Sequence, residues 1–218
     1  MALSYPLGLG AFFTDVEIIN SRFSLGDARQ FNTGGGGQIF DASLGARLWS
    51  GEITIVPAKH QELAKIESRI ELLMEPGASF LAYDKRCTWP YADPTGSILG
   101  AATPTLGAVN ANNVDVTIAG LPVGYVLTQG DMFSFSYLSS PVRRALHRVV
   151  AGATADGSGN ATVQVVPPIR AGYTLATAVA LNKPLMKAKM LPGTYQPSSG
   201  MPGKLSSGLT FQFTQTLK

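Results

Sequence analysis

The chain has 218 residues, of which 45% are hydrophobic and only 14% are charged, enough for one large domain or two small ones with a real core. The net charge is +3 and no run of Lys and Arg exceeds two residues, which argues against a dedicated nucleic-acid-binding surface. A single cysteine, Cys87, excludes an intramolecular disulfide, and no apolar stretch is long enough for a membrane span. A surface this poor in charge suits a subunit that buries area against its neighbours.

The first quarter of the chain predicts strands and loops. Residues 16–19, VEII, form a short apolar run, and residues 33–38, TGGGGQ, contain four consecutive glycines. No Lys-Ser or Lys-Thr pair follows these glycines, so they predict a flexible loop tip and not a phosphate-binding loop. Between residues 49 and 55, apolar side chains alternate with Ser50, Glu52 and Thr54, which predicts a half-buried strand.

Residues 58–75 predict the one convincing helix. Apolar residues recur there at spacings of three and four, at Leu63, Ile66, Ile70 and Leu73. Pro57 stands just before this segment, and Pro76 and Gly77 end it. His60 lies among polar residues in the first turn, so we expect it on the surface. Residues 79–84, SFLAYD, predict a strand directly after the helix.

The middle of the chain changes character. Residues 85–110 are rich in proline and glycine and show no clear period, which predicts a passage from one domain into another. Five short strands follow, at 114–118, 131–137, 146–154, 161–166 and 177–181. They are joined by turns such as LPVGY at 121–125 and contain no helix, so they predict a small antiparallel barrel or sandwich.

The run TADGSGN at 154–160 permits two interpretations. Asp156, Ser158 and Asn160 place oxygen-bearing side chains at alternate positions, as a calcium loop does. An EF-hand loop starting at Asp156 would need Gly at its sixth position and Glu at its twelfth, where this chain has Ala161 and Pro167. Asp-Gly between two alternating apolar segments therefore favours a hairpin turn.

The chain closes with the cleanest amphipathic strand of the sequence, LTFQFTQTL at 209–217, after a loop predicted at 191–208. Such a strand needs a partner, and we expect it to pair with the strands that precede residue 84. This predicts a discontinuous domain of residues 1–90 and 188–218, with residues 91–187 inserted as a β-barrel domain.

The sequence contains few residues in patterns typical of catalytic sites. His60 and His147 are too few for a three-histidine zinc site, and no HExxH, GxSxG or SxxK motif is present. We therefore expect no enzyme activity, no cofactor and no metal site, although fourteen acidic residues leave a glycosidase-type carboxylate pair open. The aromatic face formed by Phe133, Phe135 and Tyr137 fits either a barrel core or a stacking platform. Arg143, Arg144 and Arg170 are the best candidates for an electrostatic contact.

The order of these elements resembles the distal tail proteins of long-tailed bacteriophages and related tail-tube-fold subunits. The resemblance rests on WSGEITIVPAKHQELAKIESRIELLMEPGASFLAYD at 49–84 and on the returning strand GLTFQFTQTL at 208–217. Segments 121–135, 146–170 and 177–191 are similar to a module of phage tail proteins. These motifs are strand and turn patterns, so the family supplies no catalytic residue.

The resemblance implies a tail-tube-like β-sandwich with one α-helix, interrupted by a small antiparallel β-barrel. It also implies a structural virion protein, made in the host cytoplasm, that forms a homohexameric ring between the tail tube and the tip or baseplate. Tail tube and hub proteins would be its partners, DNA would only pass through the channel, and no membrane insertion is expected. The alternative is a virion-associated glycan hydrolase or carbohydrate-binding module.

Overall fold

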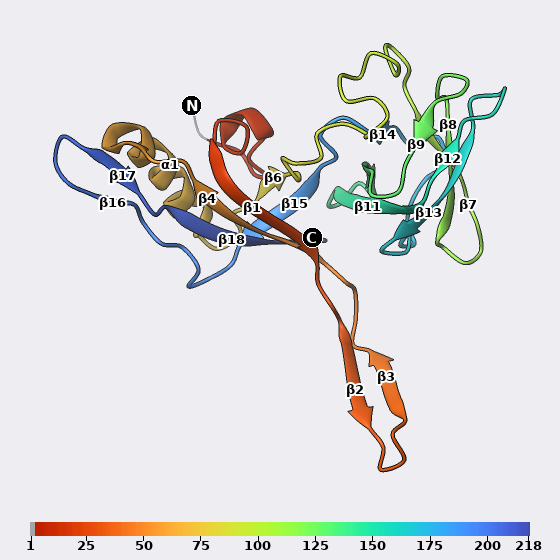
Figure 1. Ribbon diagram of the computed structural model, residues 1–218, viewed down its shortest axis with the longest axis horizontal. Coiled ribbons are helices and arrows are strands. Elements are labelled where there is room, and N and C mark those ends of the chain that lie inside the picture. Colours follow the sequence, from red (N-terminus) through yellow and green to blue (C-terminus); the bar gives the residue numbers. More distant parts are fainter. Residues whose placement is uncertain (1–2) are drawn as a thin grey trace. The chain divides into compact units, whose positions relative to one another are not determined.

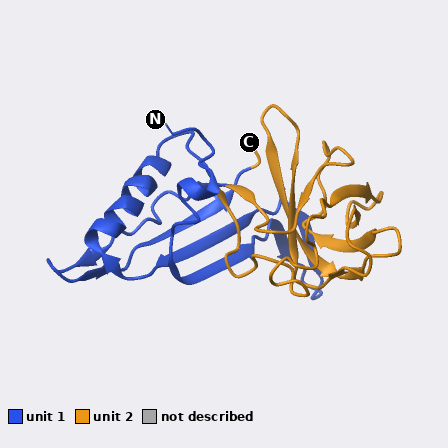
Figure 2. Cartoon of the chain, turned by 90° about the horizontal axis from the view of Figure 1, so that it is seen from above, with its two compact units in different colours: residues 1–80, 188–216 blue, residues 81–187, 217–218 orange. Residues whose placement is uncertain are grey.

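The computed structural model describes residues 3–218, which form a mainly β structure with one α-helix (Figure 1). The chain divides into two compact units, shown in different colours in Figure 2. Unit 1 contains the chain up to Phe80 together with Ala188–Thr216, and unit 2 contains Leu81–Lys187 with Leu217–Lys218. The predicted mainly β class with a single α-helix is confirmed for the described residues.

The division after Phe80 lies earlier than the boundary that the sequence predicts at residue 90. Of the intervening residues, Leu81 and Ala82 end the strand β6 (Phe80–Ala82), and the contact-based division assigns all of them to unit 2. Trp89 packs against the hydrophobic core of unit 2, and the backbone N–H of Tyr91 donates a hydrogen bond of 2.8 Å to Asp131. Both contacts join residues that are distant in the sequence, which no local sequence pattern shows.

Unit 1 is built on a five-stranded sheet in the order β1-β4-β18-β15-β6. The strands are β1 (Ile18–Leu25), β4 (Trp49–Ile55), β18 (Thr210–Gln215), β15 (Met186–Met190) and β6 (Phe80–Ala82). The last strand, β18, lies between β4 and β15 and is antiparallel to both. The prediction that the C-terminal strand returns to the first part of the chain is therefore confirmed.

The period-two pattern of these strands separates a buried face from a polar one. On β18, Phe211, Phe213 and Gln215 are buried, and the residues between them are half-buried. Helix α1 (His60–Leu73) buries Leu63, Ile70 and Leu73 and lies along one side of the sheet (Figure 2). The segment after the short 3₁₀ helix η1 (Leu9–Ala11) adds Phe12 and Phe13, which contact Phe80 edge-on and at a tilt.

Two small sheets complete unit 1. Strand β5 (Ala58–Lys59) pairs with β17 (Leu205–Ser207), which pairs with β16 (Ser199–Gly200). The prediction that residues 191–208 are only loop is therefore wrong for these short strands. Strands β2 (Arg29–Thr33) and β3 (Ile39–Ser43) form an antiparallel hairpin, and residues 34–38 are its tip, as the four glycines predict.

Unit 2 contains a six-stranded sheet in the order β14-β10-β11-β13-β8-β7. The strands are β7 (Thr105–Val109), β8 (Asp115–Ala119), β10 (Met132–Tyr137), β11 (Arg143–Ala151), β13 (Ala161–Val166) and β14 (Val179–Ala180). A second pair joins β9 (Val126–Leu127) to β12 (Ala153–Thr154). The β11–β13 hairpin is confirmed, and β7 is an additional strand inside the segment that the sequence predicts to be irregular.

The strands of unit 2 that the structure describes do not form a closed barrel, and the predicted sandwich arrangement of unit 1 is not confirmed either. The two edges of the six-stranded sheet are connected by a single bridge, between Thr105 and Ala178. Backbone hydrogen bonds accompany this bridge, from Leu106 N to Thr177 O at 2.9 Å and from Ala176 N to Leu106 O at 2.8 Å. Within residues 3–218, no helix has the length and apolar character needed to cross a membrane.

Candidate functional site

The turn at Asp156 is a structural feature. Its Oδ1 atom accepts hydrogen bonds from the backbone N–H of Ser158 at 2.8 Å and of Asn160 at 3.0 Å. The carboxylate therefore organises the turn before β13, as Asx turns do. Among the described residues, no group of three or more His, Cys, Asp or Glu side chains is close enough to hold a metal ion.

The aromatic face of β10 belongs to the core of unit 2. Phe133, Phe135 and Tyr137 are at most 5% exposed, so they are unavailable as an external stacking platform. His147, opposite Phe133, is also buried, and its Nδ1 donates to the carbonyl oxygen of Pro167 at 2.7 Å, because a carbonyl can only accept. Burial lowers the pKa of His147 to about 4.

The arginines that the sequence singles out do not form one site. Arg143 and Arg144 are neighbours on β11 and therefore point to opposite faces of the sheet. The guanidinium of Arg144 donates to Ser136 Oγ at 3.2 Å, and burial lowers its pKa. Arg170 lies close enough to His147 to oppose protonation of that ring.

The buried carboxylates of unit 2 are committed to hydrogen bonds within the protein. Asp84 forms an ion pair with Arg86 at 2.8 Å, and Asp93 accepts from the backbone N–H of Leu99 at 2.8 Å. Asp131 accepts from the backbone N–H groups of Tyr91 and Thr128. These contacts give each carboxylate a role in holding loops together.

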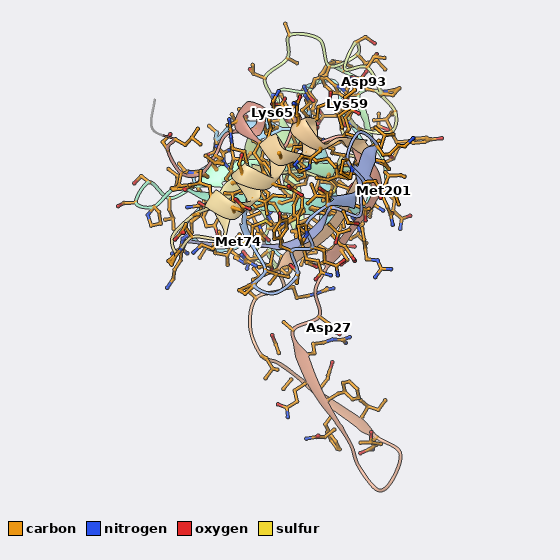
Figure 3. All side chains as sticks on the ribbon, turned by 90° about the vertical axis from the view of Figure 1, so that its left-hand side faces the viewer. Asp27, Lys59, Lys65, Met74, Asp93 and Met201 are labelled. Carbon is orange, nitrogen blue, oxygen red and sulfur yellow. The ribbon has the colours of Figure 1, made fainter. Side chains whose placement is uncertain are left out.

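The most unusual surface is the β2–β3 hairpin, here called the arm, which extends away from the sheet of unit 1 (Figure 1). All ten of its strand residues are exposed. Phe31 and Ile39 are each 69% exposed and Phe40 is 63% exposed. Phe31 pairs with Asp41 and Phe40 with Asn32, so the two phenylalanines lie on opposite faces of the arm. Figure 3 shows the side chains of the arm standing alone beyond Asp27.

Two exposed ion pairs formed by Arg29 lie at the base of the arm. Arg29 donates to Asp27 at 3.0 Å and contacts Asp41 across the hairpin at 3.4 Å. The hydrogen bond from Arg29 lowers the pKa of Asp27. Exposed pairs of this kind contribute little stability, and an isolated two-stranded hairpin is marginal in water. The interactions within the arm are therefore too weak to stabilise the hairpin by themselves.

The polar face of the unit 1 sheet is the second extended surface. Three cross-strand rows run over it, Arg22–Glu52–Gln212, Asn20–Thr54–Thr210 and Ser24–Ser50–Thr214. Strand β1 forms one edge of this sheet, with β4 as its strand neighbour. A groove of about 560 Å³ lies beside α1, and its lining combines apolar residues with five charged ones, Asp15, Glu17, Glu62, Lys65 and Arg69.

No protein-family model matches the chain, and comparison with curated proteins finds no sequence match. The resemblance to phage distal tail proteins therefore stays a prediction. Sequence reasoning missed the arm, because the strands RQFNT and IFDAS carry no burial-related alternation. The available signal was three large apolar residues, Phe31, Ile39 and Phe40, on either side of a glycine-rich tip.

Proposed function

We propose that this chain is a structural virion protein that assembles into a homohexameric ring at the distal end of a phage tail tube. The arm carries the proposal. Large apolar side chains on both of its faces are exposed, which is rare for a surface that remains in water. Burial against neighbouring copies would remove these side chains from water and stabilise the hairpin.

A ring requires two different surfaces that meet head to tail and close by rotation. The arm supplies one surface, and the groove beside α1, which has both apolar and charged lining residues, is the surface that we propose for the neighbouring copy. The long edge strand β1 supports the same arrangement, because pairing with a neighbour would cover its open side.

We further propose that the polar face of the unit 1 sheet lines the channel. Its rows contain Ser, Thr, Asn and Gln around the single cross-strand pair Arg22 and Glu52. A channel for DNA should avoid dense positive charge, since fixed phosphate contacts would slow passage. In this proposal, DNA passes without specific contacts, and the ring joins the tail tube protein to the tip or hub proteins.

For unit 2 we propose a small barrel whose seam is formed by the hydrogen bonds between residues 104–106 and 176–179. Its buried carboxylates, committed to backbone N–H groups, support a role in binding or assembly over glycan hydrolysis. The carbohydrate-binding alternative has a specific observation in its favour, a pocket lined by Trp89 and Tyr91.

Light scattering coupled to size-exclusion chromatography of the full chain tests the ring. The expected species has six times the monomer mass of 22.9 kDa, and negative-stain images should show closed rings. The same measurement is repeated with co-expressed tube protein, which tests assembly on the end of a tail tube. A chain that stays monomeric in both measurements would overturn the proposal.

A further inference from the structure

The segment from Asp84 to Leu99 in unit 2 has no helix or strand, yet buried carboxylates fix its course. Asp93 is 1% exposed, and its two oxygens accept from the backbone N–H groups of Ile98 at 3.2 Å and Leu99 at 2.8 Å. Asp131, 3% exposed, accepts from Tyr91 N at 2.8 Å. An irregular loop held this firmly is a rigid support for whatever its side chains contact.

This loop displays two aromatic side chains. Tyr91 is 84% exposed, the most exposed large hydrophobic side chain among the described residues. Trp89 lies against Gly96, whose φ is +73°, and a methyl group added to that glycine would lie 2.2 Å from the indole ring. The absence of a side chain at Gly96 therefore leaves room for the Trp89 ring, which also packs against the core of unit 2.

Trp89 and Tyr91 line one pocket, of about 520 Å³, together with Gln129 and the backbone of Gly130. The pocket also contains Arg86 and Asp131, but both charges are already engaged within the protein. Arg86 pairs with Asp84 at 2.8 Å, and Asp131 accepts hydrogen bonds from Tyr91 and Thr128. The pocket therefore offers an aromatic surface and the side-chain amide of Gln129, together with one positive and one negative side chain.

We propose that this pocket binds a neutral saccharide, with a sugar ring stacked on Tyr91 beside Trp89 and a hydroxyl bonded to Gln129. A sugar ring has an apolar face for the aromatic side chains and polar edges for the amide. A single-stranded nucleic acid fits less well, because its phosphates need several cations and Arg86 is the pocket's one cation, already paired. This inference goes beyond ring assembly and stands independently of it.

The test uses the full-length protein and four neutral tetrasaccharides: cellotetraose, N-acetylchitotetraose, maltotetraose and mannotetraose. Binding is followed by saturation-transfer NMR and by tryptophan fluorescence, to which Trp89 contributes from the pocket while Trp49 is fully buried in unit 1. We expect saturable binding of at least one tetrasaccharide. Replacing Tyr91 with Ala should weaken it by about tenfold or more, as loss of one stacking partner does.

Tyr91→Ala should remain folded, because the side chain is exposed and the backbone N–H bond to Asp131 is kept. Gln129→Ala provides a second lining variant, and Leu175→Ala removes an exposed apolar side chain of unit 2 that does not line the pocket. The Leu175 variant should bind as the wild type does. Absence of saturable binding to all four saccharides, equal binding by the Tyr91 variant, or tighter binding of an eight-residue oligothymidylate would overturn the inference.

Discussion

The aromatic ring of Phe213 lies directly over Gly51, its cross-strand partner in the β4–β18 register. A methyl group added at Gly51 would lie 2.2 Å from Cζ of that ring. Phe213 also contacts Phe13, Phe23 and Phe80, with ring centroids 5.6–6.4 Å apart. The absence of a side chain at residue 51 therefore makes room for the centre of the unit 1 core.

We expect Gly51→Ala to destabilise unit 1 by about 1–3 kcal/mol, because the ring must leave its packed position. Gly10→Ala is the matched control, since a methyl group there meets no atom within 4 Å. The measurement is urea unfolding followed by the fluorescence of Trp49, in a Trp89→Phe background so that the signal comes from unit 1. Equal midpoints for the two variants would contradict this account of the core.

The C-terminal strand should be indispensable, because β18 has a neighbour on each side in the sheet. Deleting residues 209–218 should abolish soluble folding, since it exposes the edges of β4 and β15 and removes Phe211 and Phe213 from the core. The milder Phe211→Ala should cost about 3–5 kcal/mol. Gln212→Ala, on the polar face, should cost well under 1 kcal/mol by contrast. A truncated chain with a cooperative unfolding transition would refute the arrangement.

The presence or absence of a periodic apolar pattern explains which parts of this fold could be predicted from the sequence. Strand β18 and helix α1 separate apolar from polar residues at a clear period, so the sequence predicts that Phe211 and Leu63 are buried. The arm has no buried face, so its two strands show no alternation of apolar and polar residues from which their pairing could be predicted. The pocket depends on Asp131 contacting Tyr91 forty positions earlier, a relationship that no local pattern contains.

The burial of His147 predicts a pH dependence of stability. Its pKa is about 4 in the folded chain and about 6.5 when unfolded, so the unfolded chain binds the proton more tightly. This contribution is complete above pH 6.5, and stability is lost as pH falls from 6.5 towards 4, by up to about 3 kcal/mol. Chemical unfolding of unit 2 between pH 7 and pH 4 measures the loss.

His147→Gln should flatten that pH profile, although it lowers stability at pH 7 by disturbing the bond to Pro167. The exposed His60, replaced by Gln, should keep the wild-type slope. If the His147 variant retained the full wild-type slope, another group would be responsible.

In the proposed ring, assembly should depend on the arm and folding should not. Replacing Phe31 and Phe40 with Ser removes the apolar groups from both faces, and we expect the ring to dissociate to monomers. Both side chains are exposed in the single chain, so its thermal midpoint should change by less than about 2 °C. Val123→Ser changes a 72% exposed residue of unit 2 and should leave the ring intact. An intact ring in the arm variant would exclude the arm as the contact.

The rigidity of the loop from Asp84 to Leu99, which carries Trp89 and Tyr91, should depend on Asp93. In Asp93→Ala, the backbone N–H groups of Ile98 and Leu99 lose their buried acceptor, which should cost about 1–3 kcal/mol. Asp156→Ala removes the same number of backbone hydrogen bonds from an exposed turn, where water replaces the carboxylate, and should cost less. Hydrogen exchange separates the two variants, because the amides of residues 98 and 99 should exchange faster only when Asp93 is replaced. Unchanged protection at these amides would mean that Asp93 does not hold the loop, and its carboxylate would then have no part in orienting Tyr91.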